Sequence, residues 1–131
     1  MVTDRVGDFI IRLQNAAMIG KEEVRTQHST FLTQIAKKLK ELGFLKSVDV
    51  EGDTIKKMLV VTLANDEHGN PKLRGVSRVS KPGRRLYGAH TEEHRVKGGT
   101  GARIISSSMG IISDAEARKN HVGGEYLFEI W

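Results

Sequence analysis

The chain has 131 residues, a formal net charge of +5, a sequence pI near 9.6 and no cysteine. A chain of this length forms one domain or two small lobes, and the absence of cysteine excludes disulfides, thiolate chemistry and cysteine-based metal sites. No apolar run approaches the roughly 18 residues of a membrane span, and no basic leader precedes an apolar stretch. We therefore expect neither a membrane protein nor a signal peptide.

The positive charge is concentrated in one segment. Residues 1–67 contain ten basic and ten acidic residues, and residues 114–131 contain two basic and four acidic ones. Residues 68–113 contain nine Lys or Arg against two Glu, a net charge of +7. Such an excess is typical of a strip that binds nucleic acid, although a solvated basic face without a partner would have the same composition.

Two helices are expected first. Thr3 or Asp4 can cap a helix that ends near Gly20, and a second helix begins near Ser29 and ends at Gly43, which suits a left-handed C-terminal cap. Both predictions rest on apolar residues at helical spacing. These are Val6, Phe9, Ile10, Leu13, Ala16 and Ala17 in the first helix, and Leu32, Ile35, Ala36, Leu39 and Leu42 in the second.

Strand patterns follow. Val48 and Val50 alternate with acidic residues, Gly52-Asp53 indicates a turn, and residues 55–63 are rich in apolar and β-branched residues. Residues 65–71 indicate a loop, and residues 73–80 can return as a third strand. Residues 1–80 are thus predicted to form an N-terminal α+β lobe, in which two helices pack on a three-stranded antiparallel sheet.

Lys81-Pro82-Gly83 interrupts this pattern and marks the predicted lobe boundary. Residues 81–131 are predicted to form a mostly β lobe, with short strands at 86–87, 102–107, 111–112 and 126–130. Ser113 and Glu116 match a capping box, which predicts a short helix up to about Asn120. The predicted fold class is α+β with two small lobes.

One motif suggests an enzyme. His90, Glu93 and His94 fit the H-x-x-E-H pattern of a zinc hydrolase, but that pattern needs a buried helix, and here it lies in a polar stretch. Residues 98–101 resemble a phosphate loop but lack its Lys-Ser/Thr ending. We therefore favour loops in both places and expect no metal, no cofactor and no small-molecule substrate.

Two other stretches have the chemistry of RNA contact. Lys81, Arg84 and Arg85 surround a rigid turn before Tyr87, so guanidinium groups can bind phosphates while the ring stacks on a base. A core tyrosine flanked by solvated cations is the alternative. Ser106-Ser107-Ser108 offers hydroxyls before Gly110. Strand alternation would send Ser107 to the opposite face from its neighbours, and read alone the run is an ordinary polar turn.

In combination these motifs resemble one family. The residues concerned are Val79 to Tyr87, Gly99-Thr100-Gly101, Ile104 to Gly110, Ser113-Asp114, Ala117-Arg118 and Val122 to Glu125, together with Asp4 to Ala16 and Leu39 to Leu45. This set resembles bacterial small-subunit ribosomal protein eight over essentially the whole chain.

The resemblance implies a two-lobe α+β structural protein without catalytic activity. It would bind the central domain of small-subunit ribosomal RNA early in assembly, in the cytoplasm, near proteins such as five and twelve. An RNA-binding module outside the ribosome is the alternative. Carried over by position, the RNA-binding residues are Ser106, Ser107, Ser108, Gly110, Gly123, Gly124 and Glu125, then Tyr87, Lys81, Arg84 and Arg85, and Ser29.

The sequence departs from the family pattern where the family usually has lysine. Met109 and Thr30 stand at two such positions, so each removes a cation. We therefore expect the serine loop to act through hydroxyls and close backbone approach more than through charge.

Overall fold

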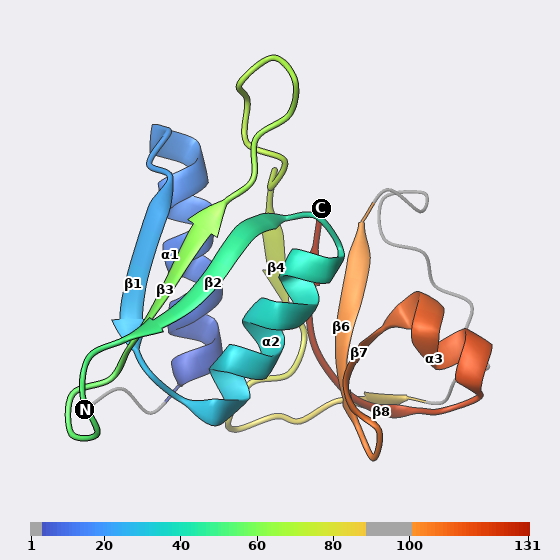
Figure 1. Ribbon diagram of the computed structural model, residues 1–131. Helices are drawn as coiled ribbons and strands as arrows, with labels where there is room; N and C mark the ends of the chain where they lie inside the picture. Colours follow the sequence, from blue (N-terminus) through green and yellow to red (C-terminus); the bar gives the residue numbers. More distant parts are fainter. Residues whose placement is uncertain (1–3, 89–100) are drawn as a thin grey trace. The chain divides into compact units, whose positions relative to one another are not determined.

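The computed structural model describes residues 4–88 and 101–131 (Figure 1). The chain divides into two compact units: Asp8–Arg74 forms one, and Gly75–Trp131 with the described part of Met1–Gly7 forms the other. The division into lobes at residues 1–80 and 81–131 stays a prediction. None of the helices in these ranges is long and apolar enough to cross a membrane.

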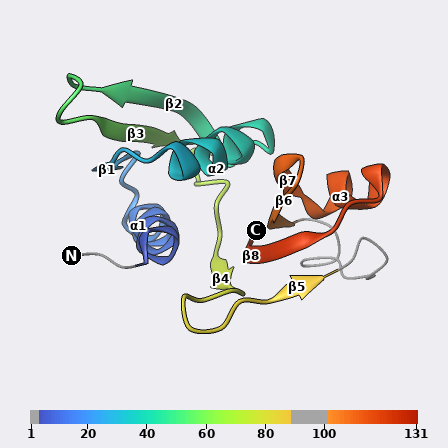
Figure 2. The same ribbon diagram turned by 90° about the horizontal axis from the view of Figure 1, so that it is seen from below.

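The unit Asp8–Arg74 is built on a three-stranded antiparallel sheet. Its strands are β1 (Glu23–Gln27), β2 (Leu45–Glu51) and β3 (Met58–Leu63), with β3 in the centre. Helices α1 (Arg5–Ile19) and α2 (Thr30–Glu41) lie on one side of this sheet (Figure 2). The largest fully buried side chains of the unit come from all these layers: Phe9, Ile10, Leu13, Leu32, Ile35, Leu39, Leu59 and Val61.

Both predicted helices are confirmed, with their ends fixed by capping. The Asp4 carboxylate accepts a hydrogen bond from the Gly7 N–H at 3.1 Å, and Ser29 Oγ accepts one from the Leu32 N–H at 3.4 Å. After α2, Gly43 has φ +92°, which a residue without Cβ adopts at little cost. The chain can therefore turn back so that Phe44 and Leu45 enter the core.

The three-stranded sheet was predicted, but the identity of its third strand was wrong. That strand is β1, whereas residues 73–80 contain β4 (Val76–Arg78), which belongs to the other sheet. β4 pairs with β8 (Gly124–Ile130) near the end of the chain. The sheet that β4 joins is therefore determined by a partner about fifty residues away in sequence, which local pattern does not reveal.

The second unit has a five-stranded antiparallel sheet with β8 at its centre. β4, β5 (Tyr87–Gly88) and β6 (Ala102–Ser107) all pair with β8, and β7 (Gly110–Ser113) pairs with β6. The fold class is α+β, as predicted.

The predicted capping box begins α3 (Asp114–Asn120), because Ser113 Oγ accepts from the Glu116 N–H at 3.3 Å and Glu116 accepts in return from the Ser113 N–H at 3.3 Å. Helix α3 packs on β6 and β7. The buried cluster beneath it consists of Ile105, Ile112, Ala117 and Tyr126.

The beginning of α1 belongs to this second unit. The Asp4 carboxylate forms an ion pair with the Arg78 guanidinium on β4, and both side chains are largely withdrawn from solvent. The Arg78 hydrogen bond, together with the Gly7 N–H, lowers the pKa of Asp4 below its usual value near 3.8. This charge pair fixes the start of the chain against β4.

Candidate nucleic-acid interface

The strand register brings most of the predicted site residues into two adjacent rows across the five-stranded sheet. Cross-strand pairing aligns Tyr87 with Glu125, Glu125 with Ser106, and Ser106 with Ile111, and we call these four residues the tyrosine row. One position along, the pairs align Gly88, Gly124, Ser107 and Gly110, which we call the glycine row. Paired residues project from the same face, so each row has a single face.

The glycine row is nearly bare backbone. A Cβ on Gly124 would lie 2.2 Å from the Ser106 carbonyl oxygen, and a Cβ on Gly88 would lie 1.7 Å from the Tyr126 hydroxyl oxygen. Both distances are far inside van der Waals contact, so these positions require glycine for packing reasons within the unit. At Gly110, by contrast, a Cβ would meet nothing within 4 Å, so this end of the row leaves room for a bulky partner to approach the backbone.

The serines differ in what their hydroxyls do. Ser107 Oγ donates to the Gly110 carbonyl at 3.0 Å and accepts from the Met109 N–H at 3.1 Å, so it organises the turn between β6 and β7. Ser106 is half-buried in the tyrosine row, and Ser108 and Met109 are exposed at the turn. The predicted opposition of Ser106 and Ser107 is confirmed by the strand register.

The basic turn is a compact, self-bonded structure. The Lys81 N–H donates to the Arg84 carbonyl and the Arg84 N–H to the Lys81 carbonyl, each at 2.9 Å, around Pro82-Gly83. Ser80 is 2% exposed, and its hydroxyl accepts from the Leu86 N–H at 2.9 Å and donates to the Leu86 carbonyl at 3.2 Å. This one side chain therefore closes the base of the turn that presents Lys81, Arg84 and Arg85.

An ion pair connects the basic turn to the tyrosine row. Arg85 Nη1 lies 3.2 Å from Glu125 Oε2, and the Glu125 side chain is 14% exposed whereas that of Arg85 is 55% exposed. Tyr87, beside Glu125, is 69% exposed and is therefore a surface residue, which excludes the alternative of a core tyrosine. Arg85, Glu125 and Tyr87 form one continuous patch in which the Tyr87 side chain is exposed.

A second arginine supports the site from within the sheet. Arg103 donates to Glu129 Oε2 from Nε at 3.0 Å and from Nη2 at 2.7 Å, and its guanidinium lies 4.3 Å from the centre of the Tyr126 ring. Arg103 therefore stiffens the packing beneath Gly88 instead of presenting charge to a ligand.

Four contributors were not identified from the sequence: Ser80, Gly88, Arg103 and Ile111. Only the register, the side-chain contacts and the hydrogen bonds reveal them, because each acts through a partner that the fold brings to it. Ser80 stands directly before the basic motif, which is the one local signal available.

The two remaining predicted residues lie outside the rows. Gly123 precedes β8 directly. Ser29 belongs to the unit Asp8–Arg74, where its hydroxyl caps α2.

The zinc pattern of His90, Glu93 and His94 lies outside the described residues, as does most of the glycine stretch 98–101. Within residues 4–88 and 101–131 no group of three or more His, Asp or Glu is placed to hold a metal ion.

The fold and the sheet rows define a class: a small α+β protein with a preformed surface of hydroxyls, bare backbone and cations at one end of a sheet. Residues 4–131 match the family model described as ribosomal protein S8. The chain belongs to the ribosomal protein S8 family, which is not an enzyme family.

The chain is similar to proteins named small ribosomal subunit protein uS8 over its full length. It is 38% identical to that of Nautilia profundicola and 40% identical to that of Helicobacter pylori strain Shi470, with all of each chain covered. It is 38% identical to that of Brevibacillus brevis, covering 99% of that protein.

Proposed function

We propose that this chain is a structural protein of the small ribosomal subunit, located in the cytoplasm, that binds ribosomal RNA through the tyrosine and glycine rows. Family membership supports the ribosomal role, and the cross-strand alignment of Tyr87, Glu125 and Ser106 is the observation that carries the RNA-binding role. The central domain of the small-subunit RNA is the proposed target, and holding it in one shape is the proposed contribution to assembly.

The chemistry of this surface fits the recognition of folded RNA. The Lys81–Arg85 turn presents cations for phosphates, the exposed Tyr87 ring offers a stacking platform, and Ser106 and Ser108 offer hydroxyls for 2′-hydroxyls or base edges. Because Ser107 already bonds to Met109 and Gly110, its role is to shape the turn. The open backbone at Gly110 then allows close approach of the RNA backbone.

Neighbouring small-subunit proteins are the other proposed partners, and proteins five and twelve are the specific candidates. No small-molecule substrate is proposed.

The Arg85–Glu125 ion pair explains how a carboxylate can lie in an RNA-binding surface. The Arg85 guanidinium offsets the negative charge of Glu125, so that charge is not left free toward the RNA.

The first prediction concerns the serine hydroxyls. Replacing Ser106 and Ser108 together with alanine removes hydrogen bonds worth about 0.5–1.5 kcal/mol each, so affinity for the central-domain RNA should fall roughly 5- to 150-fold. Thermal unfolding should change little, because neither hydroxyl has a hydrogen-bond partner among the described residues. Filter binding or calorimetry with a central-domain transcript measures the effect.

The matched control is Ser77→Ala, which removes an exposed hydroxyl from β4 of the same sheet. It should leave RNA affinity unchanged. Equal affinity of the Ser106/Ser108 variant and the parent protein would refute the proposed surface. Binding a random RNA duplex as tightly as the central-domain transcript would instead favour an RNA-binding module outside the ribosome.

A further inference from the structure

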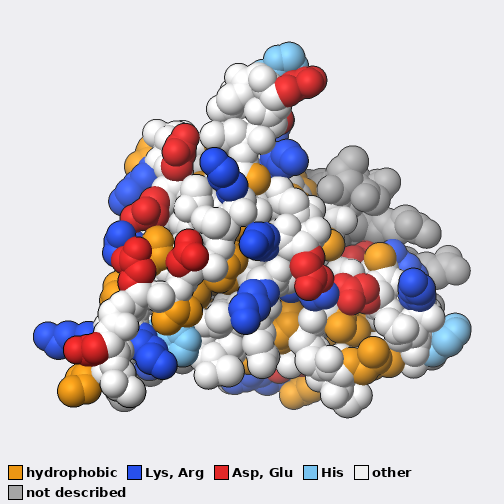
Figure 3. Space-filling model, viewed as in Figure 1, with side chains coloured by type: hydrophobic (Ala, Val, Ile, Leu, Met, Phe, Trp, Pro, Cys, Tyr) orange, Lys and Arg blue, Asp and Glu red, His pale blue; other side chains and the backbone are white. Residues whose placement is uncertain are grey.

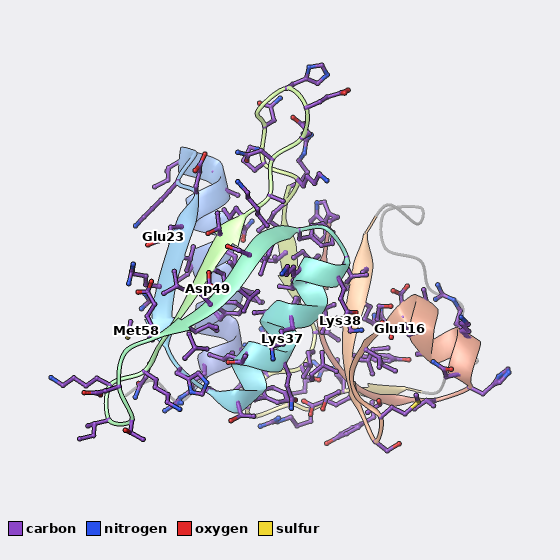
Figure 4. The ribbon with its side chains drawn as sticks, in the orientation of Figure 1. Glu23, Lys37, Lys38, Asp49, Met58 and Glu116 are labelled. Carbon is purple, nitrogen blue, oxygen red and sulfur yellow. The ribbon has the colours of Figure 1, made fainter. Side chains whose placement is uncertain are left out.

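A second surface on the unit Asp8–Arg74 has the chemistry of an RNA contact. It is the tip of the hairpin between β2 and β3, residues 52–57, which extends beyond the three-stranded sheet (Figures 1 and 4). Every residue from Glu51 to Met58 is exposed. Figure 3 shows basic, acidic and hydrophobic side chains together at the outermost end of this hairpin.

The tip is held in one conformation by its own backbone. Asp53 Oδ1 accepts hydrogen bonds from the Ile55 N–H at 3.0 Å and the Lys56 N–H at 2.9 Å. Gly52 has φ +99°, and a Cβ there would lie 2.1 Å from the Lys56 carbonyl oxygen, so the chain closes tightly at this point. A preformed tip loses little conformational freedom on binding.

The acidic groups near the tip are already engaged. The Asp53 carboxylate is used by the two backbone N–H groups, and Glu51 is paired with Arg25 at 2.8 Å. In contrast, the ammonium groups of Lys56 and Lys57 have no ion-pair partner within the described residues. The tip therefore presents two ammonium groups without an ion pair, while its one unpaired carboxylate, that of Asp53, accepts hydrogen bonds from the backbone of the turn.

An apolar side chain stands directly beside these cations. Ile55 is 88% exposed, the highest value among the large hydrophobic residues exposed in the described chain. An exposed apolar residue directly before two lysines fits a partner whose surface combines phosphates with apolar sugar faces. The wide, shallow minor groove of an RNA helix has that combination.

The base of the hairpin lies beside the start of α2. The His28 N–H donates to the Lys57 carbonyl at 3.1 Å, and the next residue, Ser29, is the N-cap of α2. Lys57 is therefore at the same end of the unit as Ser29, for which RNA contact is also proposed. The hairpin tip and Ser29 are therefore parts of one proposed RNA-binding surface.

We propose that this hairpin tip is a second RNA-binding element, in which Lys56 and Lys57 bind phosphates and Ile55 packs on the sugar surface of a helical segment. This rests on the proposed ribosomal function. The hairpin tip belongs to the unit Asp8–Arg74, whereas the tyrosine and glycine rows belong to the other unit. Each unit would therefore bind RNA through a surface of its own.

The lysines are tested by the salt dependence of binding. Each lysine that neutralises a phosphate adds about one unit to the slope of log affinity against log salt. The variant with both Lys56→Ala and Lys57→Ala should therefore bind a central-domain transcript with a slope shallower by about two units. Between 50 and 200 mM salt its affinity should fall roughly ten-fold less than that of the parent protein.

The control removes the same charge from another surface of the same unit. Lys37 and Lys40 are exposed on α2, with Lys37 labelled in Figure 4, and Lys37→Ala with Lys40→Ala should leave the slope unchanged. An unchanged slope for the Lys56/Lys57 variant, or an equal change in both variants, would overturn the proposal. The thermal unfolding midpoint of both variants should match the parent because all four side chains are exposed.

Ile55→Ala separates the apolar contribution from the ionic one. It should lower affinity several-fold at every salt concentration without changing the slope, because packing against sugars releases no counterions. Affinity equal to that of the parent protein would remove Ile55 from the proposal.

The absence of cysteine allows a direct localisation. A single Ile55→Cys substitution provides the only thiol, to which a hydroxyl-radical probe can be attached. Strand cleavage of the bound transcript is expected from this position, and background cleavage would overturn the proposal. If the Ser106/Ser108 variant binds normally in the same assay, the proposed function fails, whereas unchanged tip variants alone refute only the hairpin contact.

Discussion

Single glycines determine how closely the strands of the five-stranded sheet pack. At Gly124 the obstacle to a side chain is the backbone carbonyl of Ser106, which cannot rotate away as a side chain can. At Gly83, in the basic turn, a Cβ would meet nothing within 4 Å, and φ is not positive. The two glycines therefore have opposite tolerance for alanine.

The second prediction follows from this contrast. Gly124→Ala should reduce the free energy of unfolding by about 1–3 kcal/mol, the usual cost of overpacking, and should also weaken RNA binding by moving Ser106. Urea denaturation and RNA titration measure the two effects. Gly83→Ala serves as the control and should alter neither by a comparable amount; similar losses in both variants would contradict the packing explanation.

The third prediction concerns Ser80. In Ser80→Ala the Leu86 N–H loses its acceptor, and an unsatisfied buried group costs about 1–3 kcal/mol of stability. Because the hydroxyl closes the base of the basic turn, RNA affinity should fall even at temperatures where the variant is fully folded. Chemical denaturation and RNA binding at low temperature test this. A variant as stable as the parent would show that water replaces the hydroxyl.

Residue identity alone predicted part of this site. Strand alternation correctly placed Ser106 and Ser107 on opposite faces, because the two-residue period of a strand is a local property. The exposure of Tyr87 was left open, since Leu86-Tyr87 is too short to show periodicity. The roles of Ser80 and Gly88 depend on Leu86 and Tyr126, which only the folded chain brings to them.

At the level of elements, helices were predicted better than strands. α1, α2 and α3 each have a capping residue and, in the two longer helices, an apolar face within one continuous segment. β1 was missed because only Val24 is buried among five mostly charged or polar residues. β4 was assigned to the wrong sheet because its partner β8 is distant in the sequence.

The fourth prediction separates two roles of Ser29 at the start of α2. Ser29→Ala removes the cap and should cost about 0.5–2 kcal/mol of stability. Ser29→Asp keeps a capping acceptor and should retain that stability, while its negative charge should repel RNA phosphates. Denaturation and RNA binding of both variants test this. If Ser29→Asp binds RNA as well as the parent protein, the proposed contact near Ser29 is wrong.

At the level of the whole molecule, the Asp4–Arg78 pair attaches the start of the chain to β4. The pKa of Asp4 is lower in the folded state than in the unfolded state, because Arg78 and the Gly7 N–H stabilise the carboxylate. The folded state therefore gains stability from this pair above a pH of about 4, and loses it as the pH falls through the lowered pKa.

The fifth prediction is the pH profile of Asp4→Asn. The variant should be less stable than the parent at neutral pH, and the difference should shrink as the pH falls below the usual Asp4 pKa near 3.8. Urea unfolding between pH 7 and pH 3 measures the difference. Asp53, whose pKa is also lowered, is present in both proteins and cancels. A gap that stays constant with pH would contradict the role of the carboxylate charge.

The central position of β8 has a consequence for synthesis. The unit Asp8–Arg74 is continuous in sequence, so it has all its residues long before residues 124–130 are translated. The five-stranded sheet has no common partner for β4, β5 and β6 until β8 emerges. A nascent or prematurely terminated chain would thus present no aligned tyrosine and glycine rows. Incorporation into a ribonucleoprotein through these rows would then select chains translated through β8 and reject truncated ones.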